Sequence, residues 1–291
     1  MPKWMELLAQ VPGEIAEEAS ARLIESGASA VESRDARPGA AVLVTHFLLE
    51  EGATRKLRAA EAALADLGIG PGAIAVRNIE EVDWVTRSRG MFGAREYGER
   101  LWVRPPWEES APPPGREEIV LEPSLAFGTG RHATTALCLL AIEKFCAEKA
   151  PRRFLDIGCG TGILSAAALR LGAAEALALD LDPQAADAAR KLAEENGLAG
   201  RMRVIEGTLE PDALGEWWGK VDLLAANIFL DPLREMAPRI AEALASGGRG
   251  VLSGIGFEQA DILGGIAEAA GLAIAGRRRL EEWAAVEIEK P

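Results

Sequence analysis

The stretch FLDIGCGTG, residues 154–162, decides the fold of this chain. Apolar residues and one acid, Asp156, run into a turn that has glycine at every second position, and a helix-like segment, residues 163–171, follows at once. Glycine lets a loop bend sharply and lets a ligand approach the backbone, while the start of a helix offers free N–H groups. The pattern predicts a nucleotide-type cofactor site where the first strand of a parallel sheet ends.

The spacing of the glycines favours S-adenosyl-L-methionine over a dinucleotide. A dinucleotide fingerprint would need a third glycine where the chain has Ile163. Asp156 stands just before Gly158, and a carboxylate there suits a cationic ligand better than a pyrophosphate. We therefore expect Asp156, Gly158 and Gly160 to bind S-adenosyl-L-methionine, which carries an amino group and a sulfonium. A tight structural turn with a capping acid is the alternative.

A second acid follows the next predicted strand, residues 174–179. Asp180 lies about 20 residues beyond Gly158, where an acid that binds ribose hydroxyls is expected. Asp182 competes for this role, but Asp182 and Pro183 have the pattern of a helix N-cap followed by proline at the first helical position. The ribose is therefore assigned to Asp180.

Composition narrows the possible classes of protein. The 291 residues have room for two domains, and the net charge of −13 argues against a nucleic-acid binder. Three scattered cysteines and two histidines give no metal spacing, so we expect no metal. No signal peptide and no apolar run of membrane-spanning length is evident. We expect a cytoplasmic monomer that binds neither nucleic acid nor membrane.

The order of predicted elements divides the chain into three parts. Residues 1–80 alternate as β-α-β-β-α-β, which predicts a small ferredoxin-like domain for substrate recognition. Residues 81–115, which contain three tryptophans, several arginines and five prolines, predict a stiff linker. Residues 116–291 predict a mostly parallel, doubly covered sheet that ends in an antiparallel hairpin. Its predicted strands are 119–121, 153–157, 174–179, 202–206, 221–226, 250–254, 272–279 and 283–289.

Two more segments should meet the glycine turn at the carboxyl edge of the sheet. Asn227 ends a predicted strand, and its uncharged amide suits an amine nucleophile that must keep its lone pair free. Capping of the next helix is the alternative role for Asn227. The segment 125–135 precedes the first helix of the domain; its Thr134 and Thr135 hydroxyls open that helix, and N-capping by Thr134 is the alternative there.

The segment LEPSLAFGTGRHATT, residues 121–135, resembles the LDPGLAFGTGTHPTT signature of PrmA-type ribosomal protein methyltransferases. Residues 156–162, 180–183, 226–228 and 252–255 also resemble motifs of that family, as do 98–102 and 281–283. Four substitutions depart from the signature, namely Glu122, Ser124, Arg131 and Ala133.

This resemblance implies an α/β class I, Rossmann-like S-adenosylmethionine-dependent methyltransferase domain behind a small α+β recognition domain. It implies N-methylation of lysine side chains, and of the N-terminal amine, on the stalk-base protein of the large ribosomal subunit. Carried over residue by residue, it implies cofactor contacts from Thr135, Gly158, Asp180 and Asn227. Asn227 would position the amine with Thr135 beside it. The loop that closes over the cofactor would be Phe127, Gly128, Thr129 and Gly130.

Other functions stay open at this point. The same enzyme could act on another protein or on a small amine. The chain could also be a non-catalytic module that senses the cofactor, or a nicotinamide-linked reductase, although the glycine spacing disfavours the reductase.

Overall fold

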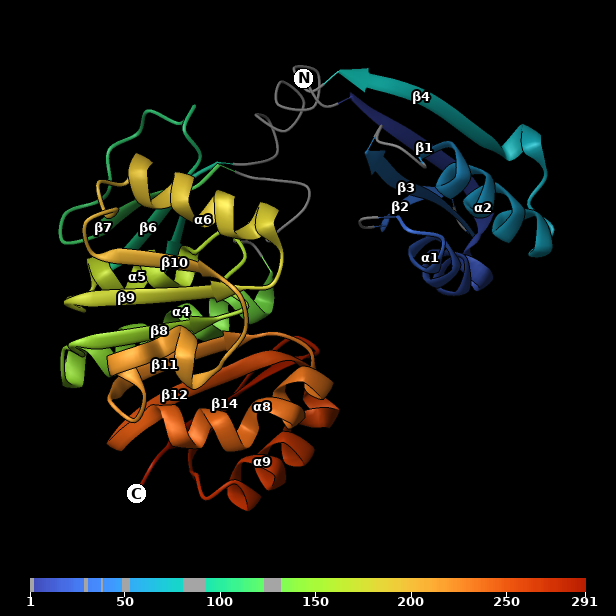
Figure 1. Cartoon of the computed structure of the whole chain (residues 1–291). Coiled ribbons are helices and arrows are strands. Elements are labelled where there is room, and N and C mark those ends of the chain that lie inside the picture. Colours follow the sequence, from blue (N-terminus) through green and yellow to red (C-terminus); the bar gives the residue numbers. More distant parts are fainter. Residues whose placement is uncertain (1–2, 29–30, 38, 49–52, 81–92, 123–131) are drawn as a thin grey trace. The chain divides into compact units, whose positions relative to one another are not determined.

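The structure is a computed structural model that describes residues 3–28, 31–37, 39–48, 53–80, 93–122 and 132–291 (Figure 1). The chain divides into two compact units, Met1–Met91 and Phe92–Pro291. Each unit is described by itself below.

The first unit is an antiparallel sheet with two helices on one face (Figure 1). The strands lie in the order β2-β3-β1-β4, and each neighbouring pair is antiparallel, which is the ferredoxin-like arrangement predicted from the sequence. Alternate residues of the strands face the helices, so Leu7, Leu43 and Phe47 pack with Leu23 and Leu64 in one core. The elements are β1 Lys3–Pro12, α1 Ala16–Glu25, β2 Val31–Arg37, β3 Ala40–Leu48, α2 Ala53–Asp66 and β4 Ile74–Glu80.

The second unit contains a seven-stranded sheet in the order β10-β9-β8-β11-β12-β14-β13. The first five strands in this order are parallel, and β14 runs antiparallel between β12 and β13. The predicted α/β class is therefore confirmed, with the hairpin at the predicted edge. The strands are β8 Arg153–Ile157, β9 Glu175–Asp180, β10 Met202–Glu206, β11 Val221–Asn227, β12 Leu244–Gly256, β13 Ala273–Leu280 and β14 Trp283–Glu289.

Helices cover both faces of this sheet, so each strand is apolar on both sides. Phe154 of β8 joins the core formed with α4, α5 and α6, whereas the next residue, Leu155, joins the core formed with α8 and α9. The helices are α4 Ala133–Glu148, α5 Ile163–Arg170, α6 Pro183–Glu195, α7 Pro211–Leu214, α8 Leu230–Ala243 and α9 Ala260–Ala269. No helix in the described ranges is long and apolar enough to cross a membrane.

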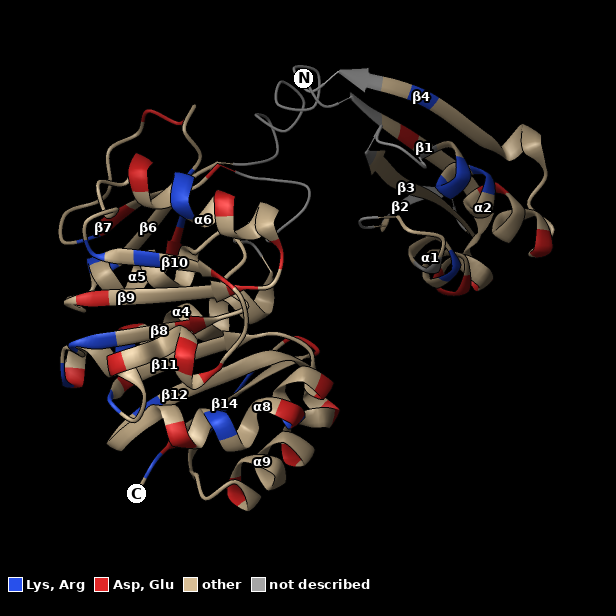
Figure 2. Cartoon of the chain, viewed as in Figure 1, with Lys and Arg blue, Asp and Glu red and all other residues tan. Residues whose placement is uncertain are grey.

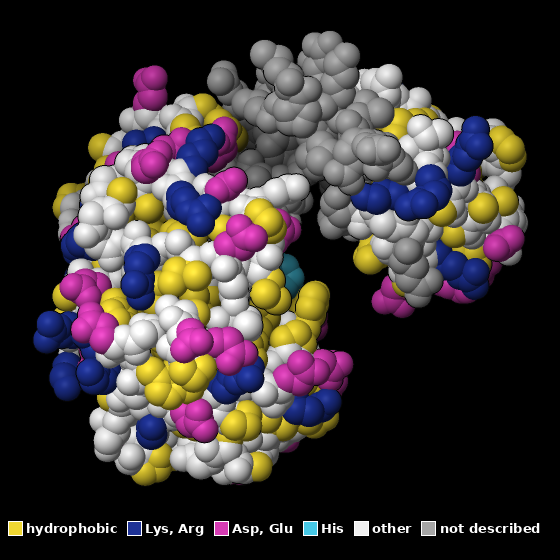
Figure 3. Space-filling model, in the orientation of Figure 1, with side chains coloured by type: hydrophobic (Ala, Val, Ile, Leu, Met, Phe, Trp, Pro, Cys, Tyr) yellow, Lys and Arg dark blue, Asp and Glu magenta, His cyan; other side chains and the backbone are white. Residues whose placement is uncertain are grey.

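Charged side chains of both signs are distributed over both units (Figure 2). On the face of the second unit seen in Figure 3, acidic and basic side chains alternate with apolar ones. Several basic side chains gather at the left edge of this unit in that view.

A separate three-stranded sheet corrects two sequence predictions. Strands β5 Arg95–Tyr97 and β6 Leu101–Arg104 lie within the predicted linker, 81–115, and β7 Glu117–Val120 pairs with β6 rather than with the main sheet. Leu101, Val103 and Ile119 are buried in the α4–α6 core. These short strands belong to the second unit. The sequence did not predict β5 and β6 because prolines and arginines interrupt their alternation of buried and exposed residues.

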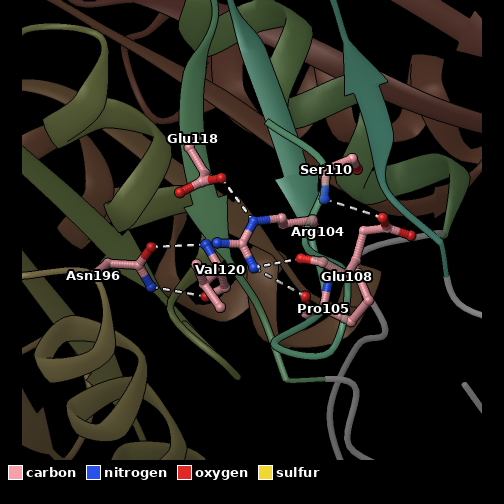
Figure 4. A network of polar contacts seen from close by, with 7 residues as sticks. All are labelled: Arg104, Pro105, Glu108, Ser110, Glu118, Val120 and Asn196. Atoms are coloured by element: carbon pink, nitrogen blue, oxygen red, sulfur yellow. Dashed lines mark hydrogen bonds and ion pairs between the residues drawn. The ribbon is translucent and has the colours of Figure 1, made fainter. Parts of the chain in front are cut away.

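The amide of Asn196, just after α6, ties the small sheet to the helices (Figure 4). Its Oδ1 accepts from Val120 N at 2.8 Å, and its Nδ2 donates to Val120 O at 2.7 Å and to Leu192 O at 2.9 Å. The side chain thus pairs with β7 in the way that a neighbouring strand would. Glu143 of α4 adds a second tie by accepting from the backbone N–H groups of Glu99 and Arg100.

An arginine holds the loop after β6 against the same sheet (Figure 4). Arg104 Nε donates to Glu118 Oε1 at 2.7 Å, and its Nη1 donates to the carbonyls of Glu108, at 2.8 Å, and Pro105. Arg104 therefore stabilises the fold of the small sheet.

We expect Asn196→Ala to lower the free energy of unfolding by about 1–3 kcal/mol, because the backbone groups of Val120 lose their partners in a partly buried setting. Denaturant unfolding measures this. Glu195→Ala is the matched control, since it removes only a surface ion pair with Lys191 and should change stability by less than about 0.5 kcal/mol. Equal losses in the two variants would contradict the role of Asn196.

Candidate active site

The glycine turn after β8 has a backbone that only glycine adopts easily. Gly158, Gly160 and Gly162 have φ angles of +67°, +53° and +79°. A Cβ on Gly158 would overlap with Cγ2 of Ile228, and one on Gly162 would lie 2.6 Å from Cε of Met202. The turn therefore packs against Ile228, just after β11, and against Met202 of β10, and these contacts fix the path of its backbone.

Asp180 holds the turn from the neighbouring strand. Its Oδ2 accepts from Gly160 N at 2.9 Å, and its Oδ1 accepts from Asp182 N at 3.0 Å. Asp182 itself caps α6 by accepting from Gln184 N at 2.7 Å, with Pro183 at the first helical position. The predicted N-cap role of Asp182 is confirmed. The side chain of Asp182 bonds to α6, whereas the side chain of Asp180 bonds to the glycine turn.

Asp156 lies beneath the turn and is fully buried. Its Oδ2 accepts from the backbone N of Ser165 at 3.0 Å and from Ser165 Oγ at 2.8 Å, in the first turn of α5. Burial raises the pKa of Asp156 to about 7; the bonds from Ser165 oppose this, and the charge of Asp180 adds to it. Asp156 can therefore act on a ligand through its charge from below the backbone.

Asn227 and Thr135 meet at the same edge of the sheet. Asn227 ends β11, and its Nδ2 lies 3.5 Å from Oγ1 of Thr135, which is in the first turn of α4. The N-cap of the following helix, α8, is Phe229. The helix-capping alternative for Asn227 is therefore wrong, and its amide is directed to α4 instead.

The cap of α4 differs from the one considered in the sequence. Nδ1 of His132 accepts from Thr134 N, so His132 and not Thr134 is the N-cap residue. The ring of His132 packs edge-on against Trp283, with 4.5 Å between centroids. Burial lowers the pKa of His132, although the charges of Glu282 and Glu281 oppose the shift. His132 is thus a neutral, structural side chain near pH 7.

The structure gathers the described candidates at one edge of the sheet. Gly158, Gly160, Asp180, Asn227 and Thr135 all lie where parallel strands end or where a covering helix begins. The remaining candidates, Phe127, Gly128, Thr129 and Gly130, lie outside the described residues.

Two exposed apolar side chains were missed by the sequence analysis. Leu181 is 74% exposed and Phe229 is 78% exposed. Leu181 directly follows Asp180, and Phe229 lies two residues after Asn227, and this closeness in sequence is the signal that could have identified them. No group of three His, Cys, Asp or Glu residues in the described part of the chain is arranged to hold a metal ion.

Comparison with known proteins agrees with this geometry. The profile of the family described as "Ribosomal protein L11 methyltransferase (PrmA)" matches residues 3–291. The chain belongs to this family. It is therefore an S-adenosylmethionine-dependent methyltransferase by family, and the resemblance found in the motifs is confirmed.

Named relatives of the L11 methyltransferase family match over most of the chain. The ribosomal protein L11 methyltransferase of Pectobacterium atrosepticum is 37% identical over 279 residues, which is 91% of this chain and 90% of that protein. The one from Pelotomaculum thermopropionicum is 39% identical over 80% of this chain and 74% of its own length. The solved ribosomal protein L11 methylase of Lactobacillus delbrueckii is 30% identical with a TM-score of 0.61, and covers 69% of this chain and 100% of its own.

We expect Gly158→Ala to destabilise the protein by about 2–5 kcal/mol, since it adds a left-handed alanine and an overlap with Ile228. It should also weaken cofactor binding, because Ile228 is next to Asn227. Denaturant unfolding and a cofactor titration measure the two effects.

Gly197→Ala is the matched control for this substitution. Gly197 has nearly the same φ, +65°, but nothing lies within 4 Å of an added Cβ. It should cost only about 1–2 kcal/mol and leave cofactor affinity unchanged. Equal effects of the two substitutions would show that packing on Ile228 is unimportant.

Proposed function

We propose that this methyltransferase transfers methyl groups from S-adenosyl-L-methionine to lysine side chains, and to the N-terminal amine, of ribosomal protein L11. The observation that carries the proposal is the match over about nine tenths of the chain to a protein of that name. Such a substrate is a ribosomal component, so the proposed reaction takes place in the cytoplasm.

The residues at the carboxyl edge of the sheet fit the cofactor. The glycine turn leaves the backbone open to close approach, and the carboxylate of Asp156 beneath it has one buried oxygen, Oδ1, with no hydrogen-bond partner among the described residues. A cationic amino group over the turn would offset that uncompensated acceptor. Asp180 is placed to receive ribose hydroxyls, and the exposed Leu181 gives an apolar surface for the base.

On the acceptor side, the residues orient an amine and exclude water. When bound, the cofactor supplies a methyl group activated on a sulfonium. The amide of Asn227 accepts a hydrogen bond from the incoming amine and leaves the nitrogen lone pair free for attack. The contact with Thr135 holds this amide in place, and Phe229 covers the approach with an apolar surface. Catalysis then consists mainly of alignment.

The amine must lose a proton before it attacks, since an exposed lysine has a pKa of about 10.4. Apolar surface at the site lowers the pKa of an amine that enters it. The net charge of −13 favours the approach of a basic protein substrate.

Labelled cofactor, the purified enzyme and purified ribosomal protein L11 test the proposal directly. Label on that protein, located by mass spectrometry on lysine side chains or the N-terminal amine, is the expected result. Label on other proteins of a lysate but not on L11 would support the second candidate, a related enzyme with another substrate. The four substitutions in residues 121–135 are the observation that favours this candidate.

We expect Asp180→Ala to weaken cofactor binding by about tenfold to a hundredfold, because it removes both the ribose acceptor and the bond to Gly160 N. Isothermal titration measures the affinity. Asp182→Ala is the control: it removes the α6 cap, costs about 1 kcal/mol of stability and should leave affinity nearly unchanged. The reverse pattern would assign the ribose to Asp182.

We expect Asn227→Ala to lower kcat by about tenfold to a hundredfold while the cofactor Kd changes by less than about threefold, if the amide orients the amine. Steady-state kinetics and a separate binding titration distinguish the two effects. A loss confined to cofactor affinity would contradict the positioning role.

A further inference from the structure

The two oxygens of the Asp156 carboxyl group differ in their hydrogen bonding. It is fully buried on β8, on the face covered by α4 and α5. Both of its described hydrogen bonds, from Ser165 N and Oγ, reach Oδ2. Oδ1 is buried and has no hydrogen-bond partner in the described part of the chain. A charged carboxylate is energetically costly in a buried position where one of its oxygens accepts no hydrogen bond. The protein without bound cofactor therefore favours a proton on Asp156.

The groups around Asp156 add negative charge or none. Asp180, on the adjacent strand, carries a carboxylate on the other side of the glycine turn. Burial raises the pKa of the Cys138 thiol, on α4, and of the Cys159 thiol, in the turn, so both thiols stay neutral near pH 7. Ser165 on α5 and Ser253 on β12 contribute hydroxyls only, and Ser253 Oγ donates to Ala284 O. A nearby cation is Arg190 of α6, which acts on the Cys159 thiol but is paired with Asp187 and is not among the groups that shift the pKa of Asp156.

We propose that Asp156 holds a proton when the cofactor site is empty and releases it to solvent when the cationic cofactor binds over the glycine turn. This inference rests on the proposed function, because it needs a positively charged ligand at this site. Asp156 is then a positioning residue, whose full negative charge appears only beneath a bound cofactor.

The direction of the effect follows from linkage. A nearby positive charge lowers the pKa of a carboxyl group, so the bound state holds fewer protons than the empty state. With an empty-state pKa of about 7, binding releases about half a proton at pH 7 and about three quarters of one at pH 6.5. Below pH 7 the cofactor affinity of the enzyme falls toward tenfold per pH unit, and above about pH 8 it no longer depends on Asp156.

Isothermal titration of the whole protein with S-adenosyl-L-methionine, in two buffers of different ionisation enthalpy, counts the released protons. At pH 6.5 the cofactor's own amino group, an α-amine of pKa about 7.7–8.0, is mostly protonated and contributes less than about 0.1 proton. The expected result is the release stated above for the wild-type protein and less than about 0.1 proton for Asp156→Asn. Asp222→Asn is the matched control, since Asp222 also accepts two backbone N–H bonds, from Arg152 and Arg153, and should release as many protons as wild type.

A ligand without the amino-acid portion tests which charge drives the release. 5′-Methylthioadenosine lacks the α-amino group and the sulfonium, so its binding should release no proton. If the wild-type protein binds S-adenosyl-L-methionine without releasing a proton, the inference is overturned, even if Asp156→Asn does not fold. If Asp156→Asn folds and releases as many protons as the wild type, the inference is also overturned. Such a result would leave the proposed function standing, whereas failure of the wild type to bind the cofactor at all would reject both.

Discussion

The contact between the glycine turn and Ile228 is the constraint on which the site depends. Ile228 N donates to Ser253 O, so this residue is fixed to β12 while its side chain rests on Gly158. Asn227, just before it, takes its position from the same packing. The turn that receives the cofactor and the amide that meets the acceptor are therefore held by one close approach between β8 and β11, and neither can shift without the other.

Two acids act on this turn from different places. Asp180, at the end of β9, accepts a hydrogen bond from the backbone of the turn, whereas Asp156 lies beneath the turn and, among the described residues, accepts hydrogen bonds from Ser165. The environment, not the residue type, separates their roles: one carboxylate offers hydrogen-bond acceptors and the other offers a buried charge that depends on what binds above it. Burial raises the pKa of the nearby Cys138 and Cys159 thiols, so both stay neutral near pH 7 and add no charge of their own.

The sequence predicted most of the large elements, because long apolar strands and amphipathic helices have strong periodicity. The strands at 153–157, 202–206 and 283–289 match their predicted bounds. Strands β5 and β6 of the small sheet were missed, since one or two buried positions among arginines and prolines give no usable period, whereas β7 was predicted at 119–121 but assigned to the main sheet. The cap by His132 and the exposed positions of Leu181 and Phe229 depend on contacts between distant segments, which local patterns do not record.

Strand β14 lies inside the main sheet although it comes last among the strands. Its neighbours, β12 and β13, have no direct ladder with each other, so each has an open side until residues 283–289 insert. During synthesis, the growing chain must keep the unpaired backbone groups of these two edges from pairing with other molecules until translation has passed that strand. A chain truncated before residue 283 would leave both edges unpaired, and it would be prone to aggregation and proteolysis.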